Sequence, residues 1–217
     1  MDETFDTSGA AQTGSGPTFL VAVEQYEPPA QRIIDDSLAA KILPRSYQLF
    51  LKPLRFSLLR NWMVNLFEKQ IEGASSAFLC RKRYIDETIV AAVENGSVDA
   101  IVNLGAGYDT RAYRLPALAT VPVWEVDQPV NIEAKQKGIR SALGKIPSHV
   151  TLVPINFMTQ ELGDVLNKHG YGGDKKTFFI WEAVSQYLTE AAVRQTFSFF
   201  AQAPIGSQLT FTYVLKA

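Results

Sequence analysis

The chain of 217 residues is 47% hydrophobic and 20% charged, a composition typical of a globular protein with one sizeable core. Its formal net charge of −1 gives no overall attraction to nucleic acid or to an anionic membrane, so neither is expected as a partner. The single cysteine, Cys80, excludes an intrachain disulfide framework, and no apolar run approaches the ~20 residues of a membrane-spanning helix. Together these features predict a cytoplasmic protein.

The amino-terminal part divides into a leader and a helical extension. Residues 1–18 are acidic and rich in Gly, Ser and Thr, without the basic and apolar regions of a signal peptide, and they predict a disordered leader. Residues 19–96 predict a helical extension, because apolar residues recur at helical spacing in three segments, residues 28–43, 54–73 and 83–96.

The pattern changes at residue 97, where short apolar runs begin to alternate with helical segments. The runs read AIVNL, VPVWEV, VTLVPI, TFFIW and QLTFTYVL, and the helices between them are expected near residues 113–119, 130–142, 160–168 and 190–202. Such alternation is typical of a mostly parallel sheet with helices on both faces. We therefore predict an α/β fold whose main domain covers residues 97–217.

Glycine, acidic and amide residues follow the predicted strands. In an open parallel sheet, ligands bind beyond the carboxyl ends of the strands. The residues expected at this edge are Gly105-Ala106-Gly107 after the first strand, Asp127 after the second, Asn156-Phe157 after the third, and Glu182 and then Tyr187 after the fourth. This edge is the predicted ligand site.

The glycine turn favours S-adenosylmethionine over NAD or ATP as the ligand. Asp127 follows Gly105 at roughly the 20-residue spacing of the ribose acceptor in nucleotide-binding units. The turn reads G-A-G-Y-D instead of G-x-G-x-x-G, and Asp109 would place negative charge where a pyrophosphate would lie. A ligand that carries an amine or a sulfonium suits this charge better, so an NAD-dependent oxidoreductase is disfavoured.

Each of these polar residues also has a purely structural interpretation. Asp127 could cap the helix that follows it, and Glu182 could cap the turn before Tyr187. Arg111 and Arg114 could form the solvated face of a helix. Their combination at one edge of the sheet favours ligand binding over these alternatives.

Three segments resemble the linked motifs of the leucine carboxyl methyltransferase family. They read VNLGAGYDTRAYRL (residues 102–115), EVDQPVNIEAKQ (residues 125–136) and WEAVSQYLTEAAV (residues 181–193), and the similarity extends from about residue 30 to the chain end. The family includes enzymes that methylate the C-terminal leucine of a protein phosphatase, and bacterial and fungal relatives that act on small molecules. The resemblance implies an S-adenosylmethionine-dependent O-methyltransferase with a Rossmann-like class I methyltransferase fold.

The resemblance also implies roles for residues at the cofactor site. Arg81, or Arg83 as a competing candidate, would pair with the methionine carboxylate of the cofactor, and Glu182 would lie near its amino group. The other cofactor-binding residues implied are Gly105 and Gly107 beneath the cofactor, Asp127 at the ribose, and Asn156 and Phe157 beside the adenine, where the family usually has Asp-Leu. Tyr187 corresponds to a tyrosine on the substrate side.

The predicted site contains no placed general base, and no catalytic residue is assigned. His149 and His169 flank the third strand and its helix on the side away from the ligand edge. A carboxylate acceptor ionises near pH 4 and needs no base at neutral pH, which favours in-line methylation of a small acid, although Asp, Glu or Tyr could serve a hydroxyl acceptor. One cysteine, two histidines and no compact carboxylate cluster predict no metal.

The end of the sequence departs from the family pattern. The resemblance implies two further strands and a substrate-covering insertion after the strand predicted at residues 209–215. The sequence therefore predicts either a fragment of a longer methyltransferase or a short form with an exposed apolar edge, which would pair in a homodimer or lie under the N-terminal helices. The alternative function is a cofactor-binding fragment or interaction protein with weak or no catalysis.

Overall fold

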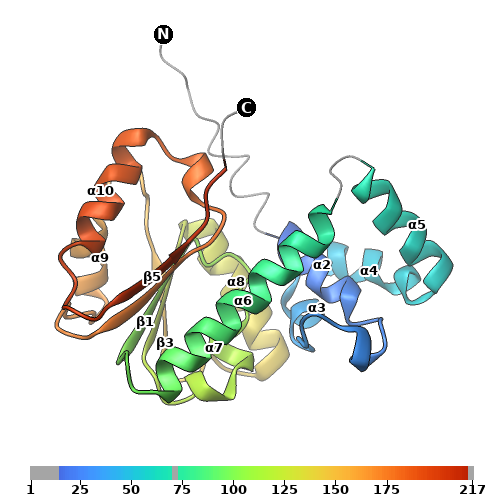
Figure 1. The fold of residues 1–217 in the computed structure, drawn as a ribbon, viewed down its shortest axis with the longest axis horizontal. Coiled ribbons are helices and arrows are strands. Elements are labelled where there is room, and N and C mark those ends of the chain that lie inside the picture. The colour runs from blue at the N-terminus through green and yellow to red at the C-terminus, as the bar shows by residue number, and fades with distance from the viewer. Residues whose placement is uncertain (1–14, 70–72, 215–217) are drawn as a thin grey trace, which may run out of the picture.

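A five-stranded parallel sheet forms the centre of the computed structural model, which describes residues 15–69 and 73–214 (Figure 1). The strand order is β3-β2-β1-β4-β5, and every neighbouring pair is parallel. The strands are β1 (Ala100–Leu104), β2 (Val123–Asp127), β3 (Val150–Pro154), β4 (Thr177–Trp181) and β5 (Gln208–Phe211). This doubly wound, Rossmann-like arrangement confirms the predicted fold class.

Helices cover both faces of the sheet. One face carries α9 (Leu162–Lys168) and α10 (Glu190–Phe200), and the other carries α6 (Ala74–Glu94), α7 (Arg111–Arg114), η3 (Pro116–Leu118) and α8 (Pro129–Leu143). Successive strand residues point to opposite faces, so Val102 belongs to the apolar cluster that includes Phe199 of α10, while Ile101 belongs to the cluster that includes Ile89 of α6. All residues of β1, β2 and β4 are buried, as expected for strands covered on both sides.

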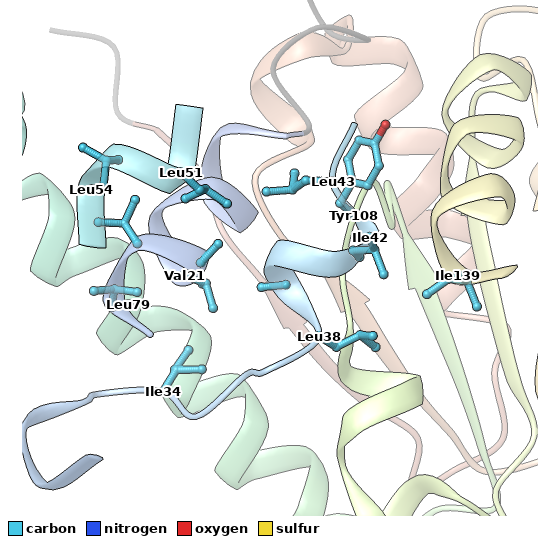
Figure 2. Packing of buried hydrophobic residues seen from close by; sticks show 13 residues of the cluster. Val21, Ile34, Leu38, Ile42, Leu43, Leu51, Leu54, Leu79, Tyr108 and Ile139 are labelled. Atoms are coloured by element: carbon cyan, nitrogen blue, oxygen red, sulfur yellow. The ribbon is translucent and has the colours of Figure 1, made fainter. Parts of the chain in front are cut away.

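The amino-terminal extension packs against one end of the sheet domain. The extension predicted over residues 19–96 also contained α6, but this helix packs on a face of the sheet. The elements of the extension that lie beside the sheet domain are α2 (Gly16–Glu24), η1 (Pro29–Gln31), α3 (Ala39–Ile42), α4 (Arg45–Leu51), η2 (Lys52–Arg55) and α5 (Ser57–Glu68). Figure 2 shows its apolar core, which also includes Tyr108 and Ile139 of the sheet domain. Helices α3 and α8 approach closely because Gly138 has no side chain: a Cβ there would lie 2.3 Å from the Ile42 carbonyl oxygen.

The helix predicted over residues 28–43 is wrong for most of its length. Residues 32–38 contain no helix, because the side chains of Glu24 and Gln25, at the carboxyl end of α2, bind three of their backbone N–H groups. The Glu24 carboxylate accepts from the N–H groups of Ile33 and Ile34 at 2.6 and 3.2 Å, and the Gln25 side chain accepts from that of Asp36 at 3.0 Å. Apolar spacing indicated burial correctly, but the backbone of this segment is bonded to another helix.

The boundaries of the extension also differ from the prediction. Helix α2 begins at Gly16, so residues 16–18 of the expected leader are helical, and residues 1–14 lie outside the described residues. None of the helices within the described ranges combines the length and apolar character needed to cross a bilayer.

The last strand is shorter than predicted and ends at Phe211. Thr212 leaves the strand pattern because it binds the loop after β4: its Oγ1 accepts from the Ala183 N–H at 2.7 Å, and its carbonyl accepts from the Ser185 hydroxyl at 2.9 Å. Leu215, the end of the predicted strand, lies outside the described residues.

Candidate functional site

A cavity of about 880 Å³ opens at the carboxyl ends of the strands, around the point where the chain order reverses between β1 and β4. Ligands bind at this switch point in doubly wound folds, and the volume is typical of a small-molecule site. The sequence-predicted residues that line it are Arg81, Gly105, Gly107, Asp127, Asn156, Phe157, Glu182 and Tyr187. The structure therefore brings the predicted site residues together, apart from the competing candidate Arg83.

The glycine turn after β1 depends on backbone conformations that other residues adopt with strain. Gly105 and Gly107 have φ angles of 69° and 39°. The Gly105 N–H donates to the Val126 carbonyl at 2.8 Å, which fixes the turn to β2. A Cβ at Gly105 would also lie 2.1 Å from Val184 Cγ2, so the absence of a side chain allows the loop after β4 to approach the turn.

Asp127 anchors the same turn from the end of β2. Its Oδ2 accepts from the Gly107 N–H at 2.6 Å, and its Oδ1 accepts from the Gln128 N–H at 2.6 Å and from Asn131 Nδ2 at 2.8 Å. The interpretation of Asp127 as the cap of the following helix is wrong, because the N-cap of α8 is Gln128 and, among the described residues, Asp127 Oδ1 binds only the N–H of that residue and the side chain of Asn131. A carboxylate oxygen can accept two hydrogen bonds, so Oδ2 keeps acceptor capacity at the cavity wall.

Glu182, at the end of β4, forms ion pairs with three cationic side chains. Its carboxylate lies 2.8 Å from Arg81 Nε, 2.9 Å from Arg111 Nη1 and 3.7 Å from Lys82 Nζ. Burial alone would raise the pKa of Glu182, but the charges of Lys82, Arg111 and Arg81 outweigh burial and lower the pKa to about 2. The carboxylate is therefore ionised at neutral pH and holds Arg81 against the cavity.

Arg81 differs from Arg83 in its position relative to the cavity and in the hydrogen-bond partners of its guanidinium group. Arg81 lines the cavity, and its Nη2 is buried without a hydrogen-bond partner among the described residues. The side chain of Arg83 is 55% exposed, pairs with Glu87 at 2.7 Å and does not line the cavity. Arg81 and Arg83 are two residues apart on α6, which rotates one side chain by about 200° from the other, so the two point to opposite faces of the helix. The geometry favours Arg81 as the residue available to an anionic ligand group.

Arg111 was missed as a site residue, and its interpretation as part of a solvated face is wrong. It is 2% exposed and forms ion pairs with Asp86 at 2.6 Å, with Asp109 and with Glu182. Burial would raise the pKa of Asp109, but the nearby Arg111, Lys82 and Lys135 hold it well below its usual range. The negative charge of Asp109 is thus already paired with Arg111, which weakens the argument that Asp109 itself attracts a cationic ligand.

The turn after β3 presents the two residues that depart from the family pattern. Asn156 Oδ1 accepts from the Met158 N–H at 3.0 Å, and the Asn156 N–H donates to Gln160 Oε1 at 2.8 Å. Its side-chain oxygen is therefore bonded within the turn, and Nδ2 adds a donor that this side chain can offer to a ligand. Phe157 lines the cavity beside it and supplies an apolar surface.

The histidines lie outside the cavity, as expected. His149 Nε2 is 2.9 Å from the Ala112 carbonyl oxygen, and His169 Nδ1 is 2.8 Å from that of Val165. Among residues 15–69 and 73–214, no group of three or more His, Cys, Asp or Glu side chains could hold a metal ion.

Comparisons with known proteins place this site in a family context. The sequence profile of the leucine carboxyl methyltransferase family matches residues 15–201. YktD of Bacillus subtilis (strain 168), whose name assigns it provisionally to the S-adenosyl-L-methionine-dependent methyltransferases, is 34% identical over 139 residues, which are 63% of this chain and 43% of YktD. A Mycobacterium marinum protein with the same provisional description is 30% identical over 141 residues, which are 64% of this chain and 46% of that protein.

A solved structure shows more distant similarity. It is described as an O-methyltransferase family protein from Burkholderia thailandensis, and it superposes with a TM-score of 0.39 and 17% identity over 60% of this chain and 40% of that chain. The chain spans about half the length of the first two curated relatives named above. The profile match covers most of the sequence and confirms the resemblance of the three motifs: the chain belongs to the leucine carboxyl methyltransferase family.

Proposed function

We propose that the cavity binds S-adenosylmethionine and that the chain provides the cofactor site of an S-adenosylmethionine-dependent O-methyltransferase. S-adenosylmethionine is the cofactor in the names of the two relatives described above. The single observation on this chain that carries the proposal is Arg81 Nη2, a buried donor at the cavity without a partner among the described residues. An unpaired buried guanidinium nitrogen is costly, and the carboxylate of the methionine moiety would satisfy it.

The residues around the cavity fit the remaining parts of the cofactor. Oδ2 of Asp127 keeps acceptor capacity for a ribose hydroxyl, and Asn156 with Phe157 offers a donor and an apolar surface for the adenine ring. Gly105 and Gly107 keep the turn beneath the cofactor free of side chains. The bound cofactor would supply an electrophilic methyl group on its sulfonium, and the chain would align it and exclude water.

The acceptor that we propose is the carboxylate of a small molecule. No histidine lines the cavity, and a carboxylate is already ionised at neutral pH, so in-line attack needs no base. Tyr187 is 39% exposed and lines the cavity, where it is available to the substrate.

Calorimetry with matched arginine variants tests the cofactor proposal. We expect binding of S-adenosylmethionine or S-adenosylhomocysteine and no measurable binding of NAD. The variant Arg81→Gln should weaken this binding by roughly 10- to 100-fold, because hydrogen bonds to charged groups contribute about 1.5–3 kcal/mol. Arg83→Gln, which removes the same charge outside the cavity, should leave the affinity unchanged. Preference for NAD, or equal effects of the two substitutions, would contradict the proposal.

Methyl transfer to a set of small acids tests the substrate class. Transfer to a carboxylic acid but not to the matching alcohol supports the carboxylate acceptor, and the reverse preference contradicts it. Cofactor binding without transfer to any acceptor would instead favour the alternative, a catalytically weak or silent cofactor-binding protein.

A further inference from the structure

A buried ion pair lies behind the glycine turn, outside the cavity. Glu125, in the middle of β2, and Lys135, on α8, are both 0% exposed, and Glu125 Oε1 lies 2.7 Å from Lys135 Nζ. The Tyr113 hydroxyl donates to Glu125 Oε2 at 2.5 Å. None of these three side chains lines the cavity.

The lysine connects this ion pair to the glycine turn. Lys135 Nζ lies 3.3 Å from the carbonyl oxygen of Ala106, the residue between Gly105 and Gly107. The same carbonyl accepts from the Asp109 N–H at 2.7 Å. The N–H groups of Gly105 and Ala106 bind the Val126 carbonyl, so the backbone anchors one side of the turn and the ammonium group holds the other.

Stability alone does not account for this arrangement. Removing two charges from water is unfavourable, and replacing a buried ion pair by apolar residues of similar volume is often neutral or stabilising. Burial raises the pKa of the Tyr113 hydroxyl, and the neighbouring Glu125 raises it further, so the hydroxyl remains a donor to the carboxylate. The three groups form a connected unit whose contact with the site is the Ala106 carbonyl.

We propose that Lys135, fixed by Glu125 and Tyr113, is a positioning residue that sets the conformation of the glycine turn for cofactor binding. This inference rests on the proposed function for its ligand, and it extends the site to residues that do not touch the cavity. Glycines at positive φ rotate more easily than other residues. Without the ammonium group, the Ala106 peptide could rotate and withdraw the Gly107 N–H from Asp127.

The test replaces the whole unit by apolar residues, so that no buried charge is left unpaired. The variant combines Lys135→Met, Glu125→Leu and Tyr113→Phe. The matched control removes another ion pair, Arg60–Glu27, with Arg60→Met and Glu27→Leu. Arg60 resembles Lys135 because it is buried, lies 2.6 Å from its carboxylate partner and donates to a backbone carbonyl, that of Leu54, at 3.2 Å.

The first measurement is hydrogen–deuterium exchange of the ligand-free protein. We expect faster exchange in the peptide covering residues 104–109 of the triple variant, with unchanged exchange in β4 and an unfolding temperature close to that of the wild type. The control should leave the turn unchanged. Wild-type protection of the turn in the triple variant would overturn the inference, whatever the ligand.

The second measurement is the dissociation constant of S-adenosylhomocysteine. It should rise about tenfold or more in the triple variant and stay unchanged in the control. If the wild type does not bind this ligand, the proposed function fails, and the exchange experiment still decides the positioning role. If the triple variant does not fold, Lys135→Met with Glu125→Gln keeps an acceptor for Tyr113 and carries the same two measurements, with the same outcomes.

Discussion

Asp127 holds the glycine turn and also lines the cavity. It accepts three hydrogen bonds from its own surroundings, including the Gly107 N–H of the turn. These hydrogen bonds leave room for the contact with a ribose hydroxyl that we propose. The side chain that holds the turn is also the one that reaches the cavity.

The variant Asp127→Ala should weaken the binding of S-adenosylhomocysteine by about tenfold or more. It removes the acceptor for a ribose hydroxyl and leaves the Gly107 N–H without its partner, at a cost of roughly 1–3 kcal/mol. Calorimetry measures the effect, and Asp164→Ala, at an exposed position on α9, is the matched control. An unchanged dissociation constant for Asp127→Ala would restrict this residue to anchoring the turn and α8.

The glycine turn is the element on which the site depends most. It is hydrogen-bonded to β2, and its Ala106 carbonyl lies near Lys135 of α8. The loop after β4 packs directly against Gly105 because this residue has no side chain. Substitution of Gly105 would have two costs, backbone strain from its positive φ and steric overlap from its close packing, and the two can be measured separately. Gly144 has a positive φ of 80° but no neighbour within 4 Å of an added Cβ.

The variants Gly105→Ala and Gly144→Ala should therefore differ in unfolding temperature. Both carry backbone strain on the order of 1–3 kcal/mol, but Gly105→Ala also forces its Cβ against Val184 and should lower the unfolding temperature further. Adding Val184→Ala should restore part of the loss at Gly105 only. Equal losses for the two glycines, or no restoration, would show that packing against Val184 is unimportant. Thermal unfolding followed by circular dichroism measures all four variants.

The outer edge of β5 is the feature most relevant to association of the whole molecule with another chain. Within the described residues, β5 pairs only with β4. Phe211, the last residue of β5, is 40% exposed, and Tyr213, just beyond the strand, is 65% exposed. Such an edge can pair with another chain. The Thr212 N–H does not point to that edge, because it donates to the Trp181 carbonyl at 3.1 Å within the sheet. Substitution of Thr212 is therefore unsuitable for testing association, because it would break this bond to β4 or the bond from the Ala183 N–H to Thr212 Oγ1.

We propose a homodimer through the β5 edge and expect a solution mass twice the 24.0 kDa of the chain. Tyr213→Lys places a charge at this edge without removing a bond between β4 and β5, and it should give monomers. Leu143→Lys, at a 44% exposed position on α8, is the control that should leave the dimer intact. Light scattering measures the masses. A wild-type monomer would contradict the dimer.

The sequence by itself determined the sheet, the glycine turn and the polar residues of the cavity wall that follow from the strand ends. Buried parallel strands are continuous apolar runs, and a strand that stops at Gly105 shows locally where backbone must take an unusual conformation. Asp127, Asn156 and Glu182 lie at or just beyond the ends of their strands, so the common direction of parallel strands brings them to one edge. The conformation of each of these segments depends mainly on residues close to it in the sequence, so short sequence patterns predict it.

Only the tertiary structure decided which charges are buried and with which partners. Arg81 and Arg83 are equivalent in the sequence until the packed face of α6 is known. Arg111 is paired with carboxylates 25 and 71 residues away, and the backbone of residues 32–38 is bonded to a helix that precedes it. Hydrophobic spacing measures burial along one element, whereas a buried charge or an irregular backbone is stable only through partners that the fold brings from elsewhere.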